Sequence, residues 1–156
     1  MKQSLAIDLF IGLAAVLLQV MIFRHLELWG VTPDAGFLYI LGLCAIRPRT
    51  YALLTGAAIA ILLDIFLDTW GIHLFSFTLL ILTTHSLIAT QWENKLLIGQ
   101  TFLLLLVLSA VYHLIFLLVA SFAGIYDTSL LFLNFWLGSS LYTALVGIIL
   151  YLLLID

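Results

Sequence analysis

Four ionisable side chains are expected to lie at one depth within the apolar segments of this chain: Asp64, Asp68, His73 and His113. Asp64 lies inside an apolar run, one helical turn before Asp68, and His73 begins the next run. His113, counted along a later run from Lys95, reaches a similar height. Such carboxylates and imidazoles can form a hydrogen-bonded cap that holds three helices together, a proton or ion relay, or a contact with a partner protein. We favour the cap, because a carboxylate within a bilayer usually faces protein or water.

Metal binding and catalysis have little support from the sequence. His73 and His113 could join Asp64 around a zinc ion, but the chain has no HExxH motif and no paired-thiolate spacing. It also lacks a nucleophile elbow, a phosphate loop and a Gly-rich dinucleotide motif. We therefore predict no metal, no cofactor and no catalytic residue, and we interpret the protein as a non-enzyme.

Two rows of small and polar residues, each with a spacing of four, are expected to form helix-packing faces. Their members are Ala52, Gly56, Ala60 and Asp64 in one run, and Ser139, Thr143 and Gly147 in the last run. Small residues let membrane helices approach one another closely. Each row either packs the helices of this chain together, which we favour, or receives the transmembrane helix of a partner. Gln19 and Gln100 are expected to bridge helices.

The composition identifies the class of protein. Hydrophobic residues make up 65% of the chain and charged residues 8%, whereas roughly a quarter of a soluble domain is charged. A soluble protein of this length could not bury so much apolar surface in one core. The net charge of -3 with five Lys and Arg residues gives no basic patch for nucleic acid, and the single cysteine, Cys44, cannot form an intrachain disulfide. We predict an all-α integral membrane protein, surrounded by lipid, with residues 1–156 in a single domain.

Helix length sets the number of membrane spans, because a spanning helix needs about 20 apolar residues. Five runs qualify: Leu5–Phe23, Tyr51–Leu67, Ile72–Thr90, Leu96–Phe122 and Leu130–Ile155. A sixth run, Ala35–Ile46, is short for a span. Pro33 and Asp34 can open a helix there, and Pro48 disfavours helical geometry just after it, so we favour a short helix over a re-entrant segment. The sequence predicts a bundle of six transmembrane helices, with five as the alternative, joined by very short loops.

The basic residues suggest an orientation, since Lys and Arg concentrate on the cytoplasmic side of membrane proteins. Six spans with a cytoplasmic N-terminus place only Arg24 outside, whereas five spans with an external N-terminus place only Lys2 outside. The charges alone therefore do not decide between the two models. In both, the turns at 68–71 and 125–127 are outside and the C-terminus is inside. We favour six spans and a cytoplasmic N-terminus.

Several short motifs occur in a distinctive order between Pro33 and Leu87. They are a Pro33-Asp34 entry to a short helix, a basic Arg47-Pro48-Arg49 corner, Gly56 eight residues before Asp64, and Gly71 at the opening of the next span. Gln19 near the end of the first span and the polar interruption at His113 fit the same pattern. Together these features resemble the rod shape-determining protein MreD family, with Asp64 and Gly71 as the most specific positions.

The resemblance implies a non-catalytic scaffold of the bacterial cell-elongation machinery in the cytoplasmic (inner) membrane. Such a scaffold binds the bitopic protein MreC and works beside RodA and a class B penicillin-binding protein. It would link cytoplasmic MreB filaments to peptidoglycan synthesis by binding a partner's transmembrane helix. A homodimer is compatible with this role.

A rival hypothesis follows from the architecture of that family, which is similar to the substrate-binding subunits of energy-coupling-factor vitamin transporters. In such a subunit the four ionisable residues would border an outward-facing cavity, and the Ala52, Gly56 and Ala60 face would dock the coupling subunit. A proton-coupled carrier is a third class, which is disfavoured because the charges gather at one side of the bilayer rather than at its midplane.

Overall fold

The computed structural model describes residues 5–28, 30–93, 97–124 and 132–155. Within these residues the chain forms six α-helices and a short 3₁₀ helix, η1 (Phe23–His25). The α-helices are α1 (Leu5–Met21), α2 (Ala35–Ile46), α3 (Arg49–Leu67), α4 (Ile72–Glu93), α5 (Ile98–Phe122) and α6 (Phe132–Ile155). Five of them are long and apolar enough to cross a membrane, and α2 is the shorter apolar helix. The predicted class, an all-α membrane bundle, is confirmed.

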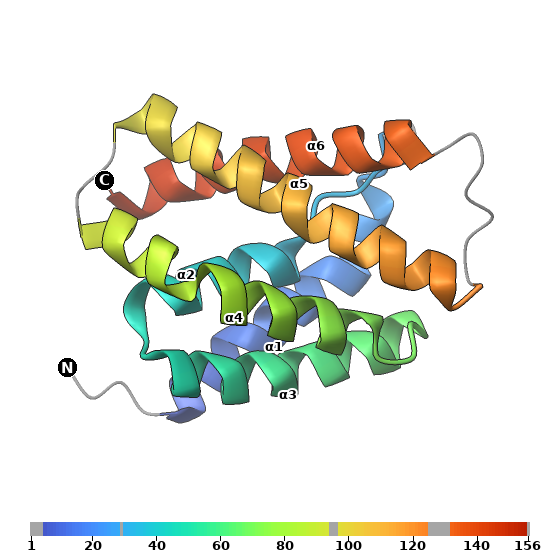
Figure 1. The fold of residues 1–156 in the computed structure, drawn as a ribbon, viewed down its shortest axis with the longest axis horizontal. Coiled ribbons are helices and arrows are strands. Elements are labelled where there is room, and N and C mark those ends of the chain that lie inside the picture. Colours follow the sequence, from blue (N-terminus) through green and yellow to red (C-terminus); the bar gives the residue numbers. More distant parts are fainter. Residues whose placement is uncertain (1–4, 29, 94–96, 125–131, 156) are drawn as a thin grey trace.

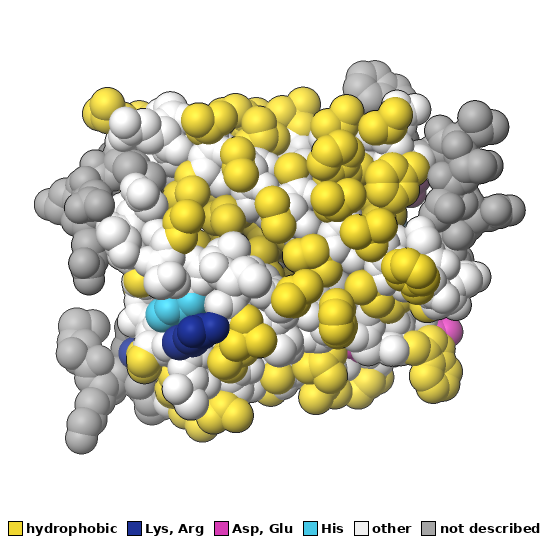
Figure 2. Space-filling model, viewed as in Figure 1, with side chains coloured by type: hydrophobic (Ala, Val, Ile, Leu, Met, Phe, Trp, Pro, Cys, Tyr) yellow, Lys and Arg dark blue, Asp and Glu magenta, His cyan; other side chains and the backbone are white. Residues whose placement is uncertain are grey.

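The helices pack around α2, which is the shortest of them at 12 residues. Helices α3, α4 and α5 pack side by side, and α2 lies behind them against α3 and α4, between α1 and α6 (Figure 1). Figure 2 shows that hydrophobic side chains cover most of the viewed face, while the basic and His side chains visible there gather at one end. This distribution fits a protein whose sides face lipid.

Local capping explains why α2 is short. Asp34 is its N-cap, with extended backbone and a side-chain oxygen that accepts a hydrogen bond from the Phe37 N–H at 2.7 Å. At the other end Arg47 and Pro48 are both extended, as expected for a residue before proline and the residue that opens the next helix. The expected boundaries of this helix, Ala35–Ile46, are confirmed.

The direction of the helices follows from contacts at one end of the bundle, the Arg47 end. Asp8 in the first turn of α1 contacts Arg47 at the α2–α3 corner. The Nε2 atom of His85, in α4, lies 2.8 Å from the Arg47 carbonyl oxygen, and the Trp92 ring near the end of α4 contacts Tyr151 near the end of α6. The opposite end, here the Asp68 end, holds η1 and the α3–α4 turn. Helices α1 and α2 are therefore antiparallel, whereas the five-span model would separate Asp8 from Arg47.

Asp8 holds three helices together at the Arg47 end. Its two carboxylate oxygens lie 2.9 and 2.8 Å from Nη2 of Arg47, and one also accepts a hydrogen bond from the Tyr51 hydroxyl at 2.8 Å. The Tyr39 hydroxyl donates to the Asp8 carbonyl oxygen at 2.7 Å. The hydrogen bond with Asp8 raises the pKa of the Arg47 guanidinium, so this ion pair persists at physiological pH. Some predicted features lie outside the described residues. They are Lys2, Lys95, the 125–127 turn, and Leu96 and Leu130, the expected first residues of the last two spans.

Replacing Arg47 by Met should lower the melting temperature of the purified protein by several degrees, because it leaves the buried Asp8 carboxylate without its cation. The matched control is Arg49→Met, which removes a guanidinium that bonds only the Leu82 carbonyl oxygen among the described residues. Thermal unfolding in detergent measures both. Equal effects of the two substitutions would contradict the assigned role of the ion pair.

A topology reporter fused to either terminus should indicate a cytoplasmic location. The reason is that the start of α1 and the end of α6 lie at the same end of the bundle as Arg47 and Arg49. Extracytoplasmic activity of the N-terminal fusion, with a cytoplasmic C-terminal fusion, would exclude six alternating spans.

Candidate functional site

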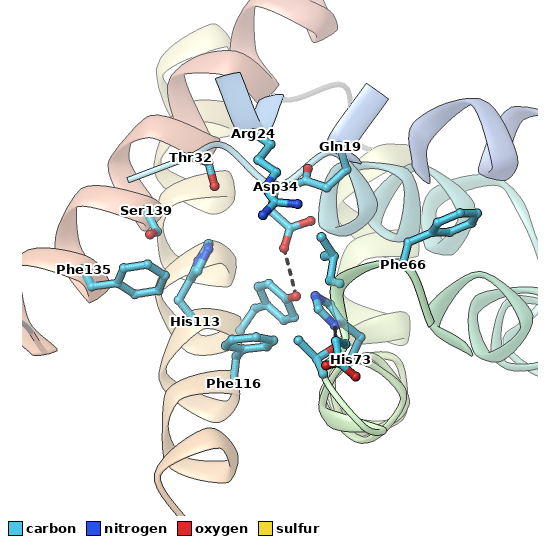
Figure 3. A pocket seen from close by; sticks show the side chains of 14 residues that line it. Gln19, Arg24, Thr32, Asp34, Phe66, His73, His113, Phe116, Phe135 and Ser139 are labelled. Carbon is cyan, nitrogen blue, oxygen red and sulfur yellow. Dashed lines mark hydrogen bonds between the residues drawn. The ribbon is translucent and has the colours of Figure 1, made fainter. Parts of the chain in front are cut away.

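A cavity of about 430 Å³, here called the Asp34 pocket, opens at the Asp68 end of the bundle. Its lining residues come from all the α-helices except α2, and from η1, the segment before α2 and the α3–α4 turn (Figure 3). The polar ones are Gln19, Arg24, Thr32, Asp34, Asp68, Thr69, His73, Tyr112, His113 and Ser139, and the apolar ones are Phe66, Leu67, Phe116 and Phe135. Three of the four ionisable residues expected at one depth line this cavity, and the fourth, Asp64, is hydrogen-bonded to two of its lining residues, Thr69 and His73.

Asp64 organises the turn that joins α3 to α4. One of its oxygens accepts hydrogen bonds from the Thr69 hydroxyl at 2.5 Å and the His73 N–H at 3.0 Å, and the other accepts from the Leu74 N–H at 3.1 Å. Nδ1 of His73 lies 3.0 Å from the first oxygen. The carboxylate thus binds N–H groups of the first turn of α4, which have no partner within the helix. Asp64 and His73 form a hydrogen-bonded cap between α3 and α4, which is smaller than the cap of three helices that the sequence favoured.

Asp68 and His113 border the same cavity without joining that cap. Asp68 ends α3 in the left-handed conformation, with φ of 56°, and lines the pocket. His113 is buried on α5, where its Nδ1 lies 2.8 Å from the carbonyl oxygen of Ser109. Both residues line the cavity, but no hydrogen bond joins either side chain to the Asp64 carboxylate among the described residues.

Asp34 has a role in the site that the sequence did not predict. The sequence assigned it only to the start of a helix. While one oxygen caps α2, the other accepts a hydrogen bond from the Tyr112 hydroxyl of α5 at 2.9 Å. The Asp34 N–H donates to Thr143 Oγ1 of α6 at 3.1 Å, and the Ala35 N–H donates to Gln19 Oε1 of α1 at 2.7 Å. The start of α2 is thereby bound to three other helices. Tyr112, adjacent to His113 in an apolar run, was the only sequence signal of this contact.

The two glutamines behave differently. Gln19 bridges α1 and α2, as predicted. Gln100 instead accepts a hydrogen bond from the N–H of Leu97 at 3.1 Å, at the start of its own helix, so the expectation that it bridges helices is wrong for the described part of the chain. Its position in the first turn of α5 explains this choice, because the N–H groups there have no partner within the helix.

The first row of small residues faces the inside of the bundle. Ala52 and Ala60 are fully buried, and a Cβ atom on Gly56 would come within 2.8 Å of Ile81 in α4 and 3.0 Å of Ile40 in α2. This face therefore packs α3 against α2 and α4. A partner's helix could reach it only by displacing helices of this chain.

The second row is also covered by the chain itself. Ser139 and Thr143 are buried, and a Cβ atom on Gly147 would come within 2.8 Å of Leu38 and 3.2 Å of Leu105. This row packs α6 against α2 and α5. In both rows the close approach of small residues serves the packing of the bundle.

The chemistry of the pocket is that of hydrogen bonding rather than of metal binding. Among the described residues, no three His, Cys, Asp or Glu side chains are grouped so that they could hold a metal ion.

Comparison of the chain with protein-family models, with curated proteins and with solved structures finds no match.

Replacing Asp64 by Asn should lower the free energy of unfolding by about 2 kcal/mol, because an amide offers one acceptor oxygen and loses the charge that strengthens these bonds. The matched control is Asp68→Asn, since asparagine also tolerates the left-handed conformation and no hydrogen bond to the Asp68 side chain is seen in the described part. Denaturant unfolding in detergent compares the two. A destabilisation by the control as large as that by Asp64→Asn would contradict the capping role.

Proposed function

We propose that this chain is a non-catalytic scaffold of the bacterial cell-elongation machinery, similar to MreD, in the cytoplasmic (inner) membrane. In this role it binds the transmembrane helix of an MreC-like bitopic protein beside RodA and a class B penicillin-binding protein. It thereby links MreB filaments to peptidoglycan synthesis. Both termini are cytoplasmic in this proposal. The resemblance of the Pro33–Leu87 segment supports the family, and one feature of α2 supports the mode of binding.

That feature is the open space at Gly42. This glycine is exposed, and a Cβ atom there would meet nothing within 4 Å, whereas the glycines that serve internal packing have close neighbours. Ile46, one turn further along the same face, is also exposed. A small residue in an exposed position lets a second helix approach the backbone of α2 closely. The bundle does not use this face of α2, so it is available to a partner's helix.

Three carboxylates of the chain, of which Asp8 and Asp64 are buried and Asp34 is half-buried, support a structural rather than a catalytic role. Asp8, Asp34 and Asp64 each bind groups from helices of this chain, at the α2–α3 corner, the start of α2 and the start of α4, respectively. The connections at both ends of α3 are also short, since two residues separate α2 from α3 and four separate α3 from α4. A partner protein that binds these segments therefore contacts them mainly within the bilayer.

The test is a substitution that fills the open face without disturbing the bundle. In Gly42→Leu the added Cβ atom meets nothing within 4 Å at an exposed position, and leucine has the higher helix propensity, so the protein should fold normally. We expect recovery of the MreC-like protein, measured by mass spectrometry after gentle detergent purification from native membranes, to fall at least tenfold.

The control for this substitution is Gly99→Leu. Gly99 is also a helical glycine at which an added Cβ atom would meet nothing within 4 Å, but it lies in the first turn of α5. The control should recover the partner at the wild-type level. Normal partner recovery by Gly42→Leu, with an unchanged melting temperature, would show that this face does not bind the partner.

The Asp34 pocket favours a second candidate, the substrate-binding membrane subunit of a vitamin transporter of the energy-coupling-factor type. A cavity of about 430 Å³ is within the range of small-molecule sites, which is roughly 300–1,000 Å³. The same purification distinguishes the two functions. Recovery of ATP-binding-cassette subunits with a bound small molecule, in place of wall-synthesis proteins, would support the second candidate.

A further inference from the structure

One wall of the Asp34 pocket presents hydrogen-bond acceptors. Nδ1 of His113 faces a carbonyl oxygen and Nδ1 of His73 faces the Asp64 carboxylate, so each Nδ1 carries a proton and donates it. In the neutral rings, Nε2 is then an acceptor, and no hydrogen bond to either Nε2 is seen among the described residues. His73 and His113 lie on either side of Asp34 (Figure 3), whose carboxylate adds further acceptor positions.

The α1 side of the pocket presents hydrogen-bond donors. Gln19 accepts the Ala35 N–H through Oε1, so its amide group is left to donate. Arg24, in η1, extends its guanidinium toward Asp34 and Gln19 (Figure 3). Arg24 is exposed and lines the pocket. A guanidinium accompanied by an amide is suited to a carboxylate.

Ser139 indicates that the pocket takes a polar occupant. Its side chain lines the cavity and is 1% exposed, yet its Oγ has no hydrogen-bond partner in the described part of the chain. Buried hydroxyls are normally paired, and an unpaired one requires an explanation. A polar group bound in the cavity would provide the missing partner.

The remaining lining suggests the size and the apolar part of the occupant. Phe66, Phe116 and Phe135 contribute aromatic surface. The cavity volume of about 430 Å³ is near the lower end of ligand sites. A compact molecule with one apolar substituent fits this lining better than a large cofactor does.

We propose that the Asp34 pocket binds a small zwitterion of the amino-acid class. Its ammonium group donates to Asp34 and to Nε2 of His73 or His113, its carboxylate accepts from Arg24 and Gln19, and one of these polar groups pairs with Ser139 Oγ. An anion without an amine would meet the carboxylates of Asp34 and Asp68, and an amine without a carboxylate would place no acceptor of its own beside Arg24 and Gln19. This inference goes beyond the scaffold function and does not rest on it; if the vitamin-transporter candidate is correct, it names the substrate class.

The experiment uses the full chain in lipid nanodiscs. A thermal-shift screen of the common L-amino acids identifies the preferred side chain, and calorimetry then compares three probes, exemplified by L-phenylalanine, phenethylamine and 3-phenylpropanoate. We expect the amino acid to bind saturably and each analogue, which lacks one charged group, to bind about tenfold more weakly. No thermal shift with any amino acid, or equal binding of the zwitterion and both analogues, would overturn the proposal.

Two variants test the assigned contacts. Arg24→Gln should weaken binding of the amino acid about tenfold but leave binding of the amine analogue unchanged, and the matched control Arg49→Gln, at the opposite end of the bundle, should change neither. Ser139→Ala removes a hydroxyl that has no partner in the described part of the protein. It should therefore preserve the melting temperature while weakening binding of the amino acid several-fold. Unchanged binding in both pocket variants would overturn the site. Partner recovery is measured on Gly42→Leu, so the scaffold proposal can fail or succeed separately.

Discussion

The structure depends on how the first turn of α2 is held inside the bundle. A helix that starts within a membrane protein has N–H groups that water cannot satisfy, so other groups of the protein must bind them. Here Asp34 caps its own helix, Gln19 accepts the Ala35 N–H, and Tyr112 binds the second oxygen of the capping carboxylate. The opposite end of α2 is held by the contact of Arg47 with Asp8. These two polar anchors fix the shortest helix of the bundle between its longer neighbours.

The same constraint explains the position of the pocket. A helix of 12 residues is about 18 Å long, whereas the hydrocarbon core of a bilayer is about 30 Å thick. Helices α3 and α5, with 19 and 25 residues, continue past the point where α2 starts. The space beyond the start of α2 is filled only in part by the segment that leads into it, and the Asp34 pocket occupies the remainder. The cavity and the cap are thus two consequences of one short helix.

The sequence predicted what depends on local patterns. Apolar run length and the residues Pro33, Asp34 and Pro48 gave the helices, with α2 correct to the residue, because spans and caps are encoded by neighbours in the chain. It did not predict the contacts of Asp8 with Arg47 or of Asp34 with Tyr112, which join residues 39 and 78 positions apart. Helical rise gives the depth of a side chain but not the direction in which its helix faces in the bundle. For this reason the sequence did not show that His113 contacts the Ser109 carbonyl oxygen of its own helix rather than Asp64.

The small residues illustrate the same distinction between pattern and direction. Gly56 and Gly42 are both glycines of apolar helices, but Gly56 faces Ile81 and Ile40, while Gly42 faces open space. Only the second can serve an external helix without rearrangement of the bundle. Gly42 lies eight residues after Asp34, about 12 Å along α2, so the exposed face and the pocket are carried by one rigid element at different depths. Because the polar anchors hold α2 at both of its ends, a side chain added at Gly42 leaves the contacts of Asp34 intact. Occupancy of the membrane-facing surface and occupancy of the pocket are therefore physically separable in this fold.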